Sequence, residues 1–233
     1  GALAGALLER RWGRALLGVG LSLHVGVMVW RGVLIGFLPL TNKMESFSSA
    51  SLALAAVALV IWRGNRLHDG LLVTLAVVSL AAALRFPLAL NDAPPLMRTL
   101  WYPLHVPLSF LAYALWAASA ASALAYVPSR AEGWLVRVDA LALQGFAVWS
   151  VSMVFGGLWG VVAWGAYFMW DPKIIWSVIL WFHYASFVHV KLAPTLATRR
   201  WLRPTLAVVG FAWVLVAYVG TSFFFGRSSH AWG

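Results

Sequence analysis

The side chains with the most unusual types and spacing lie at residues 156–176. This stretch reads Gly-Gly-Leu-Trp-Gly, then Trp-Gly, then Tyr-Phe-Met-Trp-Asp-Pro-Lys. An α-helix turns by about 100° per residue, so Trp159, Trp164 and Trp170 cannot share one helical face. The glycines would also weaken a continuous helix. We therefore expect a partly irregular segment at a membrane surface, presenting flat aromatic side chains to a large, flat and apolar molecule.

The pair Asp171-Pro172 predicts the start of the next helix, because Asp is a preferred N-cap and Pro fits the first helical position. We expect this helix to run toward His189, with Asp171 acting as a cap rather than as a catalytic acid. The alternative interpretation of the tryptophans is an aromatic belt, since Trp and Tyr collect at membrane interfaces. A belt, however, requires neither two Trp-Gly pairs nor Trp-Asp-Pro-Lys at a helix entrance.

The composition of the chain indicates which kind of secondary structure surrounds this stretch. The chain has 233 residues, 62% of them hydrophobic and 10% charged, and apolar runs of about 18 or more residues recur along it. These features predict an all-α polytopic transmembrane helix bundle of seven to eight spans, forming one integral membrane domain over residues 1–233. We expect seven clear spans at about 15–35, 46–62, 71–90, 101–127, 138–155, 172–190 and 205–225. Residues 1–8 are expected to be the tail of a further helix.

The formal net charge of +10 comes from basic residues scattered between apolar spans. This pattern favours the positive-inside topology of a protein in a lipid bilayer and predicts no nucleic-acid partner. Alternating the spans places 11 of the 17 basic residues on one side, which is then the cytoplasmic side. These 11 are Arg10, Arg11, Arg14, Arg63, Arg66, Arg130, Arg137, Lys191, Arg199, Arg200 and Arg203. His105, the tryptophan-rich stretch and His230 are then all expected to face outward.

The chain contains no cysteine. A disulfide, a thiolate-bound metal and an iron–sulfur cluster within the chain are therefore excluded, as is thiol exchange by its own side chains. Any thiol chemistry at the outer face must belong to partners.

The motif as a whole resembles a known signature. It comprises Trp159-Gly160, Trp164-Gly165, Tyr167, Trp170-Asp171-Pro172-Lys173 and Trp176, with Trp181 and His189 following. This resembles the tryptophan-rich WWD signature of the membrane proteins of cytochrome c assembly. Its Asp-Pro-Lys ending is similar to the CcsA/ResC branch, the membrane half of the system II cytochrome c synthase. Phe168 and Ile174 depart from that branch, which usually has Trp and Glu at these positions.

A second element, at residues 39–46, resembles a Pro-Leu-x-Asn-x-x-Glu-Ser sequence of the same family. The alternative interpretation is a turn followed by a helix cap, since Asn and Ser favour such positions.

The resemblance implies that the chain handles haem b, whose iron is commonly bound by imidazole. His105 and His230 match the family's pair of external ligands, and His189 matches its intramembrane histidine. The ligand opposite His189 is either His24 or a residue of a partner subunit. We interpret His183 as a hydrogen-bonded core residue and find no site role for His68, which we expect in a loop.

The resemblance also implies an external haem-binding segment at about 156–176. Its contacts would be the ones that the signature supplies, namely Trp159, Trp164, Tyr167, Trp170, Asp171, Lys173 and Trp176. Lys173 is a candidate to meet a haem propionate, or alternatively to reach the lipid headgroups.

The implied function is haem transport and presentation for covalent attachment to apocytochrome c, through its Cys-x-x-Cys-His motif. The chain would be a subunit of a cytochrome c haem lyase with a CcsB/ResB-type membrane partner. It would lie in a prokaryotic cytoplasmic membrane or a thylakoid, with the haem site on the outer face. One alternative is system I-type delivery to a periplasmic haem chaperone, which Pro172-Lys173 disfavours. The other is a channel or transporter without haem, whose tryptophans form only a belt.

Overall fold

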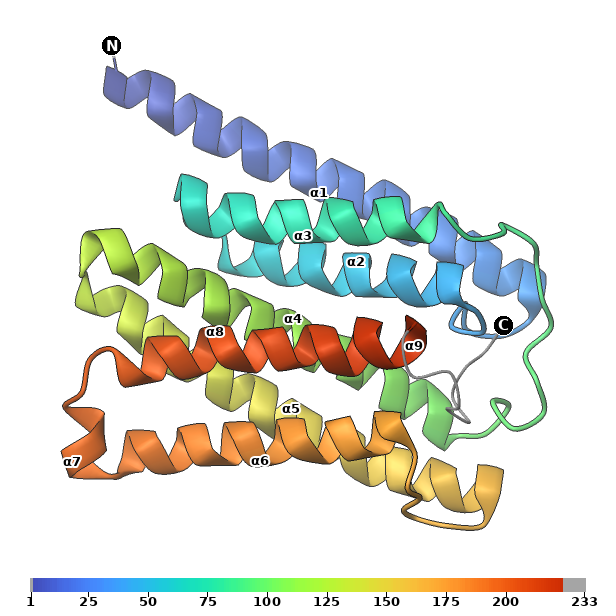
Figure 1. Cartoon of the computed structure of the whole chain (residues 1–233). Coiled ribbons are helices and arrows are strands. Elements are labelled where there is room, and N and C mark those ends of the chain that lie inside the picture. Colours follow the sequence, from blue (N-terminus) through green and yellow to red (C-terminus); the bar gives the residue numbers. More distant parts are fainter. Residues whose placement is uncertain (1, 224–233) are drawn as a thin grey trace. The chain divides into compact units, whose positions relative to one another are not determined.

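A computed structural model describes residues 2–223, and every regular element in that range is helical (Figure 1). Seven helical segments are long and apolar enough to cross a membrane. They are Arg11–Ile35, Lys43–Ile61, Arg66–Ala83, Trp101–Ser129, Glu132–Trp164, Pro172–Leu192 and Leu202–Phe223. The predicted all-α polytopic membrane fold is therefore confirmed. The chain divides into two compact units, Gly1–Asp92 and Ala93–Gly233, and the prediction of one domain stays a prediction.

The first unit contains α1 (Ala2–Ile35), α2 (Lys43–Ile61) and α3 (Arg66–Ala83). Helix α2 packs against both α1 and α3. The expectation that residues 1–8 belong to a further helix is wrong, because α1 starts at Ala2 and continues through the basic patch without a break. Glu and Arg are good helix formers, so a charged patch does not end a helix as Pro or Gly would.

Asparagine side chains begin two helices of the first unit. Oδ1 of Asn42 accepts a hydrogen bond from the Glu45 backbone N–H at 3.0 Å, and Oδ1 of Asn65 accepts one from the His68 N–H at 2.9 Å. Each bond satisfies a backbone donor of a first helical turn. The interpretation of residues 39–46 as a turn and helix cap is thus confirmed.

The expectation that His68 lies in a loop is wrong. The cap at Asn65 starts α3 one residue later, at Arg66, so His68 lies in the first turn of that helix. Its side chain is fully buried, and its Nδ1 lies 2.7 Å from Oδ1 of Asp69.

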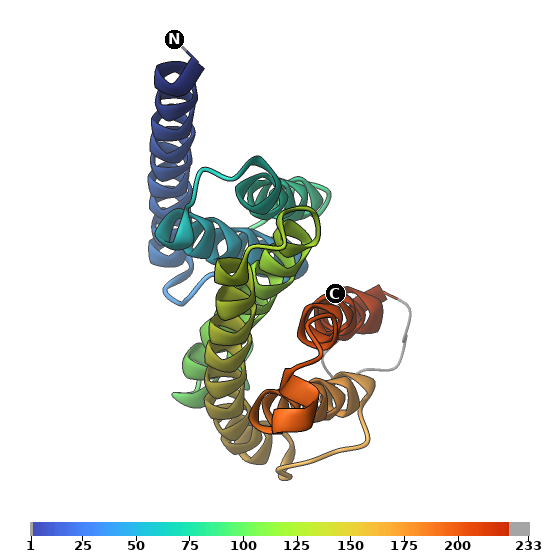
Figure 2. The same cartoon turned by 90° about the vertical axis from the view of Figure 1, so that its left-hand side faces the viewer.

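The second unit begins with a helical hairpin of α4 (Trp101–Ser129) and α5 (Glu132–Trp164). Figures 1 and 2 show these two helices running side by side, with α6 (Pro172–Leu192) and α8 (Leu202–Leu215) packed against them. The short α7 (Pro194–Ala197) joins α6 to α8, and a π-helical turn η1 (Val216–Gly220) leads into α9 (Thr221–Phe223).

The core of the second unit depends on small residues that let aromatic rings approach a neighbouring backbone. Trp116 of α4 lies against Gly145 of α5, where an added Cβ would be 2.4 Å from the indole nitrogen. The Trp116 N–H donates to the Ala142 carbonyl at 3.2 Å, and its ring stacks on that of Tyr184 with centroids 3.8 Å apart. Close approach through small residues is the usual way in which membrane helices pack.

The expected end of the fifth span at about residue 155 is wrong, because α5 continues as a helix through three glycines to Trp164. At two of these glycines, another residue packs directly against the helix backbone. A Cβ at Gly156 would lie 2.7 Å from Cε1 of His105, and one at Gly160 would lie 2.8 Å from the Ala166 carbonyl oxygen. Here glycine serves close packing, which outweighs its low helix propensity. The helix ends only at Gly165, whose φ of +74° favours glycine.

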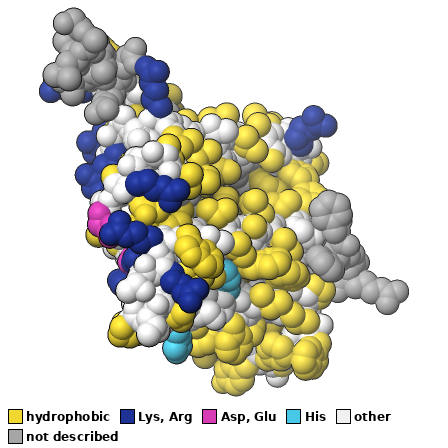
Figure 3. All heavy atoms as spheres, turned by 60° about the vertical axis from the view of Figure 1, so that its left-hand side comes forward, with side chains coloured by type: hydrophobic (Ala, Val, Ile, Leu, Met, Phe, Trp, Pro, Cys, Tyr) yellow, Lys and Arg dark blue, Asp and Glu magenta, His cyan; other side chains and the backbone are white. Residues whose placement is uncertain are grey.

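The outer surfaces of the helices carry many hydrophobic side chains, as Figure 3 shows. Val154, Val162 and Phe182 of the second unit are each about 60% exposed (62%, 58% and 60%). Exposed apolar side chains at this density suit contact with lipid rather than water.

Candidate functional site

Trp159 joins three parts of the second unit at the end of α5. Its indole N–H donates to the Leu96 carbonyl at 2.8 Å, and its ring makes edge contacts with Tyr102 of α4 at 4.9 Å and with Trp164 at 4.8 Å between centroids. The side chain is only 3% exposed. Trp159 therefore supports this end of the unit from within, and does not itself offer an open face to a ligand.

His105 lies near the start of α4, with its ring next to that of Trp159. Its imidazole is roughly parallel to the Trp159 ring, with centroids 6.2 Å apart. Its Nδ1 lies 2.8 Å from the backbone carbonyl oxygen of Ser152 on α5. A carbonyl oxygen only accepts, so the Nδ1–H donates this bond.

This bond determines the tautomer of His105. A neutral imidazole carries one ring proton, and a proton on Nδ1 leaves the lone pair on Nε2. Metal-binding histidines usually donate their second ring N–H in this way, which orients the ring and makes the ligating nitrogen more basic. His105 therefore has the chemistry of a metal ligand through Nε2.

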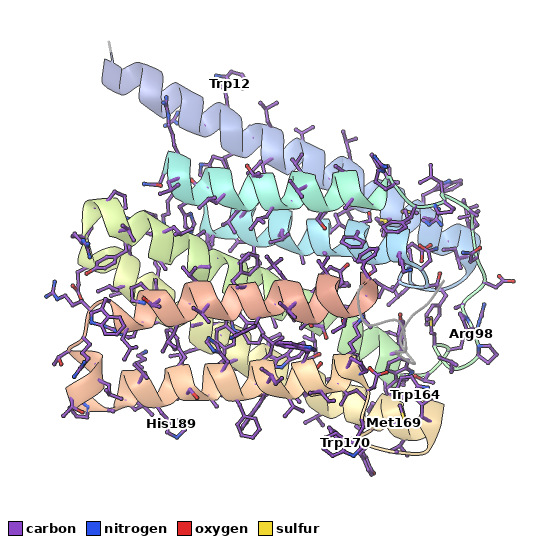
Figure 4. All side chains as sticks on the ribbon, viewed as in Figure 1. Trp12, Arg98, Trp164, Met169, Trp170 and His189 are labelled. Carbon is purple, nitrogen blue, oxygen red and sulfur yellow. The ribbon has the colours of Figure 1, made fainter. Side chains whose placement is uncertain are left out.

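The irregular part of the aromatic stretch is short, and comprises residues 165–171 between α5 and α6. Its exposed rings are those of Tyr167 (71%), Phe168 (46%) and Trp170 (85%). Figure 4 shows Trp164, Met169 and Trp170 gathered at this turn, whereas His189 lies toward the opposite end of α6. The predicted presentation of aromatic surface is thus confined to this turn and the end of α5.

Asp171 caps α6, as predicted. Its Oδ1 accepts a hydrogen bond from the Lys173 backbone N–H at 2.8 Å, its backbone is extended, and Pro172 occupies the first helical position. The carboxylate is buried. A role of the Lys173 ammonium toward a propionate stays a prediction.

Two further predicted contacts lie away from the exposed turn. Trp176 is one turn into α6, where its ring packs against Trp213 of α8 with centroids 5.5 Å apart. His189 is exposed near the end of α6, and its Nδ1 lies 2.7 Å from the Ala185 carbonyl, which again leaves the lone pair on Nε2.

The interpretation of His183 as a hydrogen-bonded residue is confirmed, since its Nε2 lies 2.9 Å from the Leu206 carbonyl of α8.

The two remaining candidate ligands lie outside the described part of the second unit. His24 belongs to the first unit, where its Nε2 lies 2.7 Å from Oγ of Ser48. His230 lies outside the described residues. The ligand roles of His24 and His230 therefore stay predictions.

Sequence reasoning missed the residues that position the predicted ones. Ser152, Ser109 and Gly156 surround His105, yet a serine or glycine in an apolar helix carries no local signal of a site. Glu45 is fully buried and bonds Nε of Arg31 at 2.7 Å. Arg31 lies within the first predicted span and Glu45 directly precedes the second. Opposite charges at these positions are the signal that could have found the pair, because intramembrane charges are expensive when unpaired.

Comparison with known proteins identifies similar sequences. A family model described as "Cytochrome C assembly protein" matches residues 20–226. A "Cytochrome c biogenesis protein CcsA" of Guillardia theta is 26% identical over 240 aligned positions, covering 85% of this chain and 77% of that protein. The protein of the same name from Synechococcus sp. (strain CC9902) is 27% identical over 270 positions, covering 94% and 86%. Another, from Gloeobacter violaceus, is 41% identical over 92 residues, which cover 38% of this chain and 26% of that protein.

Proposed function

The chain belongs to the cytochrome c assembly protein family and is an integral membrane protein of cytochrome c biogenesis, and we propose that it presents haem b for covalent attachment to apocytochrome c. Haem is the cargo of this process rather than a resident cofactor. The thiols that form the bonds belong to the Cys-x-x-Cys-His motif of the acceptor, because this chain has no cysteine. Its own residues hold and orient the cargo.

The observation that carries this proposal is the environment of His105. Its Nδ1–H is bonded to the Ser152 carbonyl, so the ring lone pair with which an imidazole binds iron is on Nε2. Imidazole is the commonest axial ligand of haem, and this second-ring hydrogen bond is the usual support of a metal-binding histidine. We infer that His105 is one external iron ligand and that His230 is the other.

The aromatic residues near His105 supply the second part of the site. The α5–α6 turn exposes Tyr167 and Trp170, and the ring of Trp164 contacts Trp159, which in turn stacks beneath His105. Offset aromatic stacking favours a flat conjugated ligand. We infer that the porphyrin contacts Trp164, Tyr167 and Trp170 directly, while Trp159 supports His105.

Charge supports an orientation with this site on the outer face of the membrane. Arg130 ends α4, and Arg199 and Arg200 lie between α7 and α8. Both turns are at the end of the second unit opposite the α5–α6 turn (Figure 1). The positive-inside rule makes the arginine-bearing end cytoplasmic. His189 then lies toward the cytoplasmic end of the second unit, and we infer that it binds haem within the membrane, in a complex with a CcsB/ResB-type partner.

The absorption spectrum of the protein purified with its partner tests the proposal. Two axial histidines give six-coordinate, low-spin iron, whereas His105→Gly opens one position and changes the spin state. The control is His183→Ala, which removes a hydrogen bond to Leu206 and leaves the spectrum of the outer haem unchanged. Full haem content and an unchanged low-spin spectrum in His105→Gly would overturn the assignment.

A further inference from the structure

We propose that Ser152 and Gly156 are positioning residues for the iron ligand, because together they fix the tautomer and the place of the His105 ring. They lie four residues apart on α5 and therefore on the same face of that helix. We name this pair, with Ser109 of α4, the His105 seat. The inference rests on the proposed function, in which His105 binds haem iron.

The hydroxyl of Ser152 makes an unusual set of bonds. Many serines in these helices donate to the carbonyl four residues earlier in their own helix, as Ser122 does to Ala118 at 2.8 Å. Oγ of Ser152 instead reaches across to α4, where it lies 2.9 Å from the His105 carbonyl oxygen and 3.1 Å from the ring Nδ1. Its side chain is fully buried.

Ser109 extends this network on the other side. Its Oγ lies 3.0 Å from the His105 carbonyl oxygen and 2.8 Å from Oγ of Ser152. Both the backbone and the ring of His105 are thereby tied to α5 by buried polar groups. Buried hydrogen bonds of this kind are costly to break, because the polar group that is left unpaired finds no water nearby.

Gly156 provides the space in which the ring lies. A Cβ built at this position would be 2.7 Å from Cε1 and 2.9 Å from Nδ1 of His105. The ring would have to move, and its bond to the Ser152 carbonyl would be lost. The neighbouring Gly157 differs, since a Cβ there would meet Tyr167 at an ordinary distance of 3.8 Å.

The expected consequence is weaker iron binding at an otherwise intact site. Loss of the group that orients a metal-binding histidine typically costs about 10- to 100-fold in affinity. Gly156→Ala is expected to reach this range and to convert low-spin iron to a high-spin form. Ser152→Ala removes only the hydroxyl and leaves the carbonyl bond, so its effect is expected to be smaller but in the same direction.

The experiment measures haem retention and the spin-state bands of the complex purified with its partner. The matched controls are Gly133→Ala, where the added Cβ meets nothing within 4 Å, and Ser122→Ala, which removes an equally buried hydroxyl that bonds its own helix. Both are expected to retain haem like the parent protein. Alanine favours a helix over glycine, so α5 itself is expected to persist in Gly156→Ala, and recovery of the complex checks this.

A double variant separates positioning from general disruption. If Gly156 acts only through His105, then Gly156→Ala adds no further loss to His105→Gly. Additive losses in the double variant would overturn the role of the His105 seat. Parent-like spectra in both Gly156→Ala and Ser152→Ala, with a changed spectrum in His105→Gly, would do the same. Either result leaves the proposed function intact. A parent-like spectrum in His105→Gly would overturn both.

Discussion

Asp171 shows how one residue of the tryptophan-rich segment serves local structure. It lies in the tryptophan-rich signature, where a carboxylate invites a catalytic interpretation. Its Oδ1 instead accepts the Lys173 backbone N–H, and its own carbonyl accepts the Ile175 N–H at 2.9 Å. Both bonds belong to the first turn of α6. Asp171 therefore fixes the position at which the exposed turn ends and the helix begins.

Asp171→Asn is expected to preserve most of this cap, because an amide oxygen accepts the same hydrogen bond. Asp171→Ala is expected to cost about 1 kcal/mol of local helix stability. Hydrogen exchange at the amides of residues 173–175 measures the difference. If Asn were as damaging as Ala, the negative charge rather than the cap would be the property that matters.

At the scale of elements, the α5–α6 turn joins a buried and an exposed set of aromatic rings. Trp159 is enclosed by α4 and the 93–100 segment, whereas Trp170 is 85% exposed. Trp164 lies between them, at the last residue of α5. The turn therefore presents one aromatic surface that rests on a rigid base, and its binding is expected to be shared among several rings.

Trp164→Phe is expected to keep most of the bound haem, since it retains a ring. Trp164→Ala combined with Trp170→Ala removes two aromatic contacts, each contributing roughly 0.5–1.5 kcal/mol beyond area burial. The affinity for haem is then expected to fall about 5- to 150-fold, which is measured as a loss of haem during purification. Trp201→Ala is the control, because this exposed tryptophan precedes α8 at the other end of the unit. Full haem occupancy in the double variant would contradict the proposed aromatic contact.

In the first unit, a buried ion pair between Glu45 and Arg31 connects several elements. Glu45 of α2 accepts hydrogen bonds from Nε of Arg31 and from the backbone N–H and hydroxyl of Thr41. The two terminal nitrogens of Arg31 donate to the carbonyls of Leu88 and Ala89. One buried pair thus holds α1, α2 and the segment after α3.

Glu45→Ala is expected to destabilise this unit by about 3–5 kcal/mol, because it leaves the Arg31 charge without its carboxylate. Replacing both residues by Met is expected to cost less, since neither charge then remains. Glu132→Ala is the control, because its pair with Arg200 is exposed at 3.5 Å, and such pairs contribute up to about 1 kcal/mol. Thermal unfolding in detergent compares the variants, and equal effects of Glu45→Ala and Glu132→Ala would contradict this role.

At the scale of the whole molecule, topology decides which partners the site can meet. The absence of native cysteine allows a direct test with single introduced thiols. Phe168→Cys, in the exposed turn, is expected to react with a membrane-impermeant maleimide added to intact cells. Thr198→Cys, at the turn that carries Arg199 and Arg200, is expected to react only after the membrane is opened. The reverse labelling pattern would place the aromatic turn on the cytoplasmic side.

The amino-acid sequence by itself determined the features that depend on local chemistry. Apolar runs of sufficient length predicted the seven spans, because the hydrocarbon of a bilayer requires them. The Asp171-Pro172 pair predicted where α6 begins, because capping and a restricted backbone act within one turn. The candidate residue His105 also came from the sequence, although through the family resemblance.

Only the tertiary structure decided what the glycines and serines of α5 do. Read locally, Gly156 and Gly160 lower helix stability by about 1 kcal/mol each relative to alanine, and we therefore expected the helix to end. In the fold Gly156 faces the ring of His105 on another helix, and Gly160 faces the Ala166 carbonyl in the turn that follows α5, so close packing outweighs that local cost. For the same reason Trp159 is buried and Ser152 bonds α4. The Ser152 bond to His105 joins residues 47 positions apart and the Trp159 bond to Leu96 joins residues 63 apart, and local sequence patterns carry no record of them.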